Sequence, residues 1–149
     1  MALFEIINND IKTAMLAREK EKLEALRSIK AAFLLAKTEK DFELTEDKEI
    51  TIIQKLVKQR KEAAEIYKTN NRTDLCDKEL FEASVLEKYL PAKISDEELK
   101  TIIKDIINNL GATSIKEMGK VIGIANKQLN GKAEGKTIAD IVKSLLSAT

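Results

Sequence analysis

Residues 91–111, PAKISDEELKTIIKDIINNLG, carry the clearest structural signal in the chain. Ser95 with the acidic residues 96–98 predicts a helix start, because a serine hydroxyl and first-turn carboxylates satisfy free N–H groups. Leucine and isoleucine then recur at helical spacing up to Gly111, which supplies a C-terminal stop. Pro91 ends any helix that precedes the segment. The sequence therefore predicts an amphipathic helix between Ser95 and Gly111.

The chain beyond this helix repeats the same pattern twice. The pair Ser114 and Glu117 predicts a capped helix that follows Ser114 and ends at Asn130-Gly131, and a weaker pair at Thr137 and Asp140 predicts a last short helix. Neither segment alternates polar and apolar residues as a strand would. We therefore expect three short helices after the proline.

The part of the chain before the proline favours longer helices. The first ninety residues contain no glycine and no proline, so only polar caps interrupt them. Apolar residues at helical spacing predict four helices, over residues 3–15, 23–34, 45–70 and 73–90. The expected fold class is all-α and multihelical: a four-helix N-terminal part, residues 1–90, followed by a small three-helix C-terminal part, residues 91–149.

The composition excludes several classes of protein. The chain has 149 residues, of which 34% are charged and only 4% aromatic, and it contains no histidine. Histidine-based triads and zincin sites are therefore excluded. A single cysteine, Cys76, excludes an internal disulfide. The longest apolar run, residues 31–36, is too short to cross a bilayer, and the first residues do not resemble a signal peptide. We expect a cytoplasmic protein with no membrane contact.

Motifs that suggest catalysis or cofactor binding have simpler interpretations. The acidic residues 96–98 follow a serine cap, which favours capping over metal binding. The sequence Gly135-Lys136-Thr137 resembles the end of a phosphate-binding loop, but Asn130 occupies the position of its first glycine and no strand precedes it. Cys76 has no histidine to activate it. We expect no catalytic residue, no metal site and no cofactor.

Arg60 lies within the apolar stripe of the third expected helix. An arginine in such a position usually pairs with a carboxylate of a neighbouring helix. Glu82 and Glu87 are the expected partners, and contact of Arg60 with a ligand is the alternative.

The best functional signal lies in the sixth expected helix. Lys116, Lys120 and Lys127 fall on one polar face, with Gly119 and Gly123 beside them. Each glycine inside a helix costs about 1 kcal/mol relative to alanine, so two of them need a reason. Either another helix backbone approaches closely at this face, or the bare, positive face lies against a polyanion backbone. The sequence leaves both alternatives open.

The loop that follows this helix extends the basic surface. It contains Lys132 and Lys136, with Gly131 and Gly135 as further candidates for close approach. Its lysines and exposed backbone N–H groups could contact phosphates. Because the formal net charge is only +1, any surface that binds anions must be local.

A second candidate phosphate-binding patch lies on the third expected helix. It consists of Lys55, Lys58 and Lys61. The alternative is an ordinary solvated face that Glu62 and Glu65 partly neutralise.

Taken together, several short motifs resemble the YqeY-like family, whose domain also forms the C-terminal tail of GatB, a component of the tRNA-dependent amidotransferase. The resemblance spans essentially the whole chain. The residues that carry it are the helix 3–15, Lys58-Gln59-Arg60-Lys61, Tyr89-Leu90-Pro91, Met118-Gly119-Lys120-Val121-Ile122-Gly123 and Gly131-Lys132-Ala133-Glu134-Gly135. In the amidotransferase tail the last loop ends in Asn-Pro where this chain has Glu134-Gly135, which favours a free-standing member of the family.

The resemblance implies an all-α fold and a link to glutamine-dependent amidation of misacylated tRNA. It supplies no active site, because carbon–nitrogen ligase activity with glutamine as amido-N-donor belongs to other parts of the larger enzyme. The first hypothesis is therefore a non-catalytic module that binds tRNA or associates with amidotransferase subunits. The second is a helical protein–protein adaptor with no RNA contact.

Overall fold

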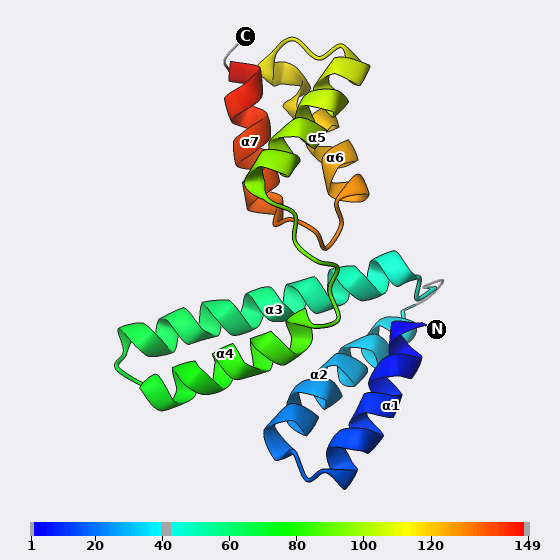
Figure 1. Ribbon diagram of the computed structural model, residues 1–149, viewed down its shortest axis with the longest axis vertical. Helices are drawn as coiled ribbons and strands as arrows, with labels where there is room; N and C mark the ends of the chain where they lie inside the picture. Colours follow the sequence, from blue (N-terminus) through cyan, green and yellow to red (C-terminus); the bar gives the residue numbers. More distant parts are fainter. Residues whose placement is uncertain (1, 40–42, 148–149) are drawn as a thin grey trace. The chain divides into compact units, whose positions relative to one another are not determined.

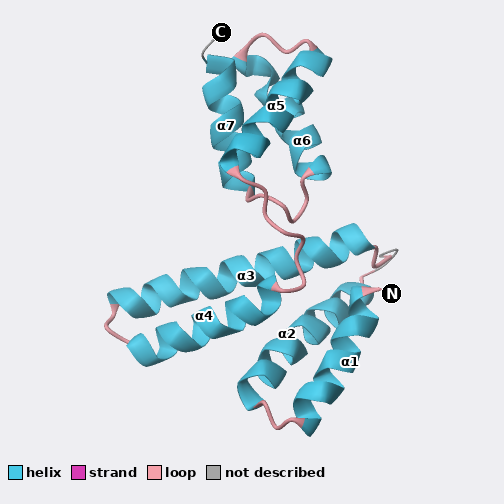
Figure 2. Ribbon diagram, in the orientation of Figure 1, coloured by secondary structure: helices cyan, strands magenta, loops and turns pink. Residues whose placement is uncertain are grey.

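The computed structural model describes residues 2–39 and 43–147. Its elements are helices, and the described residues contain no strand (Figure 2). The chain divides into two compact units, residues 1–90 and 91–149. The all-α class expected from the sequence is confirmed.

The first unit consists of two helical hairpins (Figure 1). Its helices are α1 (Leu3–Leu16), α2 (Lys20–Lys37), α3 (Glu46–Thr69) and α4 (Thr73–Glu87). Helix α2 runs back along α1, and α4 runs back along α3. Helix α2 also packs against both α3 and α4. The core between them is aliphatic, with one aromatic ring; its fully buried members include Ile7, Leu26, Ile29, Phe33, Ile53 and Leu86.

The second unit is a three-helix bundle. Its helices are α5 (Asp96–Leu110), α6 (Met118–Gln128) and α7 (Gly135–Ser147), with a 3₁₀ turn, η1 (Ile115–Glu117), directly before α6. The core is formed by the inward faces of all three helices, and its fully buried members include Leu99, Ile103, Val121, Ile138 and Val142.

Two helix starts follow the sequence closely. The Ser95 hydroxyl accepts the N–H of Glu98 at 3.2 Å, and the Thr45 hydroxyl accepts the N–H of Lys48 at 3.4 Å. Helix α7 differs: it begins at Gly135, so Thr137 lies inside its first turn and is not the cap. The start of α6 differs as well, because η1 precedes it and the Ser114 side chain makes no cap hydrogen bond.

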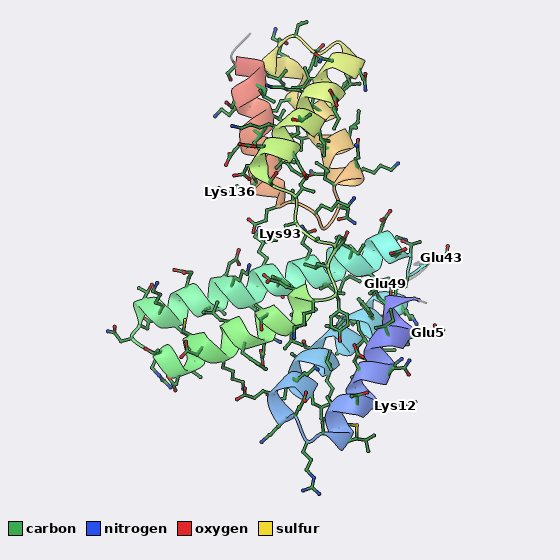
Figure 3. All side chains as sticks on the ribbon, in the orientation of Figure 1. Glu5, Lys12, Glu43, Glu49, Lys93 and Lys136 are labelled. Atoms are coloured by element: carbon green, nitrogen blue, oxygen red, sulfur yellow. The ribbon has the colours of Figure 1, made fainter. Side chains whose placement is uncertain are left out.

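The start of α1 is capped from another helix. The Glu49 carboxylate of α3 accepts the N–H of Phe4 at 2.9 Å, whereas the N-cap residue, Ala2, has no side chain that could do so. Glu49 is only 2% exposed, and Figure 3 shows it beside the first turn of α1. Burial raises the pKa of Glu49, and the hydrogen bond from Phe4 opposes that rise. A buried acid of α3 therefore fixes the start of α1 against the second hairpin.

Three helices end in the same hydrogen-bonding pattern around a residue with positive φ. After α1 this residue is Arg18 (φ 57°), after α3 it is Asn71 (φ 57°), and after α5 it is Gly111 (φ 68°). At α1 the N–H of Glu19 donates to the Ala14 carbonyl at 3.0 Å. This is the Schellman motif, in which glycine and asparagine are favoured and arginine is strained.

Replacing Arg18 with glycine should therefore stabilise the protein. We expect the free energy of unfolding to rise by about 0.5–1 kcal/mol, because relief of the left-handed strain exceeds the entropy cost of glycine. Urea unfolding followed by circular dichroism measures the change. Arg18→Ala is the matched control: it removes the charge, keeps the strain, and should not stabilise. An equal gain in both variants would assign the effect to charge.

Candidate functional site

The exposed face of α6 combines two lysines with two glycines. At 100° per residue, Gly119, Gly123, Lys127 and Lys120 fall within an arc of about 100°. All four are exposed, whereas Val121, on the opposite side of the helix, is fully buried. The bundle thus directs this surface, called the α6 face below, toward solvent.

The glycines of the α6 face are not explained by packing. A Cβ atom added at Gly119 or at Gly123 would meet no heavy atom within 4 Å in the described part of the chain, helix-backbone neighbours aside. Neither has a positive φ that would demand glycine. Alanine at both positions would favour the helix by about 2 kcal/mol in total. Packing within the described residues therefore does not explain why α6 has glycine at these two positions.

The charge of the α6 face is purely positive. Helix α6 contains no acidic residue. Just before it, the Glu117 carboxylate accepts the N–H of Thr113 at 2.6 Å. Lys116 is exposed, but it lies in η1, directly before α6, and not in the helix itself as the sequence predicts. Lys120 and Lys127 are thus the two cations that α6 itself supplies.

The loop between α6 and α7 has a structural role in addition to its charge. Gly131 is buried with φ 80°, a conformation that strongly favours glycine. The next residue, Lys132, accepts the N–H of Ile94 through its carbonyl at 3.1 Å, which ties the segment entering α5 to this loop. Lys93 and Glu134 form a further ion pair, 3.6 Å between Nζ and Oε1.

The remaining candidates of this loop are exposed. Lys132 and Lys136 are exposed, and Figure 3 shows Lys136 beside the start of α7. Gly135 is the first residue of α7, and an added Cβ there would meet no heavy atom of the described residues within 4 Å. Among the four candidate glycines, Gly131 is thus the one whose backbone conformation explains why the residue is glycine.

The second lysine patch lies in the other unit, on α3. Lys55 and Lys58 are exposed. Lys61 is different, because its Nζ lies 2.6 Å from Oε1 of Glu87 on α4. Two of the three lysines in this patch are therefore accessible to a ligand, and the third, Lys61, helps to join α3 to α4.

Arg60 forms the interhelical ion pair that the sequence predicts. Its guanidinium lies 2.9 Å from Oε2 of Glu82, which is 4% exposed, and 3.5 Å from Oε2 of Glu79. Glu82 is one of the two expected partners; Glu87 instead binds Lys61. Burial raises the pKa of Glu82, and the nearby Arg60 opposes that rise. Arg60 thus stabilises the α3–α4 hairpin.

Tyr89 joins the end of the first unit to α1. Its hydroxyl donates to Oδ2 of Asp10 at 2.5 Å. Burial and the neighbouring Asp10 carboxylate both raise the pKa of Tyr89, so the phenol stays protonated and donates. Neither this contact nor the Glu49 cap has a local sequence signal, because each joins residues more than forty positions apart.

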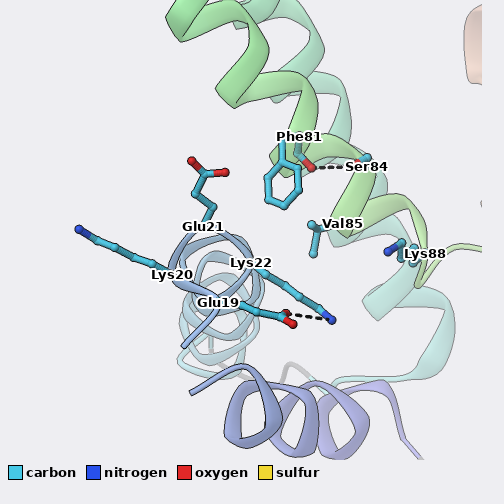
Figure 4. Close-up of a pocket in the computed structure, with 8 residues that line it drawn as sticks. All are labelled: Glu19, Lys20, Glu21, Lys22, Phe81, Ser84, Val85 and Lys88. Carbon is cyan, nitrogen blue, oxygen red and sulfur yellow. Dashed lines mark hydrogen bonds and ion pairs between the residues drawn. The ribbon is translucent and has the colours of Figure 1, made fainter. Parts of the chain in front are cut away.

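A groove lies between the start of α2 and α4 (Figure 4). It has a volume of about 480 Å³ and is lined by mixed charges and by Phe81, Ser84 and Val85. The Ser84 hydroxyl donates to the Phe81 carbonyl at 2.6 Å, and Lys22 pairs with Glu19 at 3.5 Å. Among residues 2–39 and 43–147, no group of three metal-ligating side chains gathers. Nor is any helix there long and apolar enough to cross a membrane.

Sequence comparison finds relatives among fungal proteins. The chain is 27% identical over 135 residues to "Altered inheritance of mitochondria protein 41, mitochondrial" of Clavispora lusitaniae, covering 87% of this chain and 75% of that protein. It is 30% identical over 141 residues to the protein of the same name from Kluyveromyces lactis, covering 93% and 72%. The names of these relatives contradict the expectation of a cytoplasmic protein, because they are named as mitochondrial. A single cysteine and the lack of a membrane-spanning run do not distinguish these two compartments.

The family comparison agrees with the motifs in the sequence. The family described as "Yqey-like protein" matches residues 4–146, which include both units and the whole α6 face. The chain therefore belongs to the YqeY-like family.

Proposed function

We propose that this protein is a non-catalytic module that binds tRNA through the α6 face. The observation that carries the proposal is the bare, purely positive strip of Gly119, Lys120, Gly123 and Lys127. Two glycines in one exposed helix reduce stability, and a backbone that must approach the helix axis closely accounts for them. A phosphate backbone between two ammonium groups fits this strip in both shape and charge.

Exposed lysines near α6 extend the proposed contact. Lys116 lies just before α6, and Lys132 and Lys136 lie after it in the same unit. Lys55 and Lys58 on α3 supply a second, separate patch. The resemblance to the GatB tail favours tRNA as the ligand and an amidotransferase as its setting.

Charge reversal on the α6 face tests this function. We expect the Lys120→Glu, Lys127→Glu double variant to bind bulk tRNA at least tenfold more weakly. The slope of log K against log salt should flatten by about one for each phosphate that the variant no longer neutralises. Fluorescence anisotropy with labelled tRNA at 50 and 200 mM salt measures both quantities.

The chain offers a matched control for this experiment. Lys100 and Lys104 are exposed on α5 and line a shallow groove against α7, not α6. Their double reversal to glutamate changes the charge by the same amount and should weaken tRNA binding by less than threefold. Equal losses in the two double variants would mean that net charge, not the α6 face, governs binding. Unchanged affinity in the Lys120, Lys127 variant would refute the site.

The second candidate function is a protein–protein adaptor. Gly119 and Gly123 have the spacing that lets two helices approach closely, and Ile115 and Ile124 are 46% and 41% exposed nearby. If α6 packs on a partner helix, Gly119→Leu should abolish association at every salt concentration. The lysine reversals should then have little effect. The response to salt thus distinguishes the adaptor from the RNA-binding module.

A further inference from the structure

The second unit lacks the side chains that proteins use to hold single-stranded RNA. Residues 91–149 contain no aromatic residue and no arginine. The four arginines of the chain are at positions 18, 27, 60 and 72, and its six aromatic residues are at positions 4, 33, 42, 67, 81 and 89. Single-stranded bases are held mainly by stacking on aromatic rings or on guanidinium planes. The α6 face has neither.

The same composition limits how the unit could read a base sequence. Bidentate hydrogen bonds from arginine are the commonest specific contact to guanine edges, and a lysine ammonium is a point charge without that fixed geometry. All nine cations of residues 91–149 are lysines. Lysines are suited to contact phosphates, and a contact to a phosphate does not directly read the base sequence of the RNA.

The α6 face offers two separated positive charges with exposed helix backbone between them. Lys120 and Lys127 are seven residues apart, which corresponds to about 10 Å along the helix, and Gly123 lies between them. With no side chain at Gly119 or Gly123, the helix backbone itself can lie close to the ligand. The amide of Asn126 is also exposed on α6 and can donate to or accept from a hydroxyl.

We infer that the α6 face binds double-helical RNA across its shallow minor groove, without reading the base sequence. Lys120 and Lys127 contact phosphates, the glycines allow close approach of the sugar–phosphate backbone, and Asn126 contacts a 2′-hydroxyl. Double-stranded RNA is generally recognised in this way, by shape, phosphates and 2′-hydroxyls. This inference rests on the proposed function and specifies which part of an RNA the module would contact.

Four probes test the inference on the full chain by fluorescence anisotropy at 50 mM salt. They are bulk tRNA, a 16-base-pair RNA hairpin, a pyrimidine-only single-stranded RNA of the same length, which cannot pair, and a DNA hairpin with the sequence of the RNA hairpin. We expect the RNA hairpin to bind at least tenfold more tightly than the single strand. Scrambling the paired sequence of the RNA hairpin should change the affinity by less than twofold.

Two variants connect this preference to the α6 face. The Lys120→Glu, Lys127→Glu variant should lose at least tenfold in affinity for the RNA hairpin, and the Lys100→Glu, Lys104→Glu control less than threefold. Asn126→Ala should reduce the preference for the RNA hairpin over the DNA hairpin at least threefold. An unchanged preference in that variant would overturn the assigned 2′-hydroxyl contact.

The outcomes separate this inference from the proposed function. If tRNA binds but the single strand binds as tightly as the hairpin, the duplex inference is wrong and the proposed function stands. A more than fivefold difference between scrambled hairpins would likewise overturn recognition without base reading. If tRNA and all other probes fail to bind at 50 mM salt, the proposed function and the inference are both wrong.

Discussion

Replacing Phe33 with alanine should lower the free energy of unfolding of the first unit by about 3–5 kcal/mol. The Phe33 ring is fully buried on α2, and its centroid lies 6.3 Å from that of Phe4 on α1. Its removal loses the apolar transfer energy of a large side chain and leaves a cavity that the surrounding helices fill only partly. Most domains are stable by only about 5–15 kcal/mol, so this single change removes much of the margin.

Hydrogen exchange followed by mass spectrometry, peptide by peptide, measures this effect. Amides of α1 and α2 should lose protection in Phe33→Ala. Amides of α5 should keep theirs, because the hydrophobic core of the second unit contains no residue of the first unit. Leu35→Ala is the control: it lies on the same helix and is 72% exposed, so it should change stability by less than 1 kcal/mol. Equal loss of protection in both units would show that they unfold as one.

Arg60→Met should destabilise the first unit by about 3–5 kcal/mol at pH 7. The change leaves Glu82 buried at 4% exposure without its cation, and an unpaired buried charge costs more than the ion pair contributes. Methionine keeps much of the length of the apolar stem, so reduced packing is a minor part of the effect. Urea unfolding followed by circular dichroism measures the change.

The pH dependence of stability shows whether the unpaired charge of Glu82 or the loss of packing destabilises the Arg60→Met variant. Burial raises the pKa of Glu82, so the native state holds this proton more tightly than the unfolded state. The resulting stability is present at acid pH and is lost as pH rises through the pKa of the folded protein. Loss of Arg60 raises that pKa further, so Arg60→Met should destabilise less at pH 4 than at pH 7. A loss that does not vary with pH would assign the effect to packing.

A double variant completes this test. Replacing both partners, Arg60→Met with Glu82→Leu, removes the buried charge together with its cation. Stability should recover to within about 1–2 kcal/mol of the starting protein, because apolar residues often replace a buried ion pair at little cost. Failure to recover would mean that Arg60 matters mainly through Glu79, its other neighbour at 3.5 Å.

The helix ends show where sequence reasoning works and where it does not. Ser95 and Thr45 cap the helices that their positions predict, and Gly111 ends α5. Arg18 ends α1 in the same left-handed conformation as Gly111, yet nothing about an arginine indicates such a turn. Its conformation follows from the α1–α2 hairpin, whose helices must turn back within three residues to pack together.

The sequence likewise predicts one part of the candidate site and leaves another part open. The sequence identifies the lysines and glycines of the α6 face, because helical periodicity places them together without reference to any other element. It leaves open whether a neighbouring helix of this chain covers Gly119 and Gly123. The empty space around both positions answers that question for the described residues.

The sequence by itself determined the all-α class, most helix boundaries and the composition of the α6 face. These depend on interactions within about four residues, such as caps, spacing and glycine stops, and a local pattern therefore specifies them. Only the tertiary structure decided that Glu49 caps α1, that Arg60 pairs with Glu82 and Glu79 and not with Glu87, and that no described residue covers the glycines of α6. Each of these depends on which helix faces which, and that is set by burial of apolar surface between residues far apart in the chain.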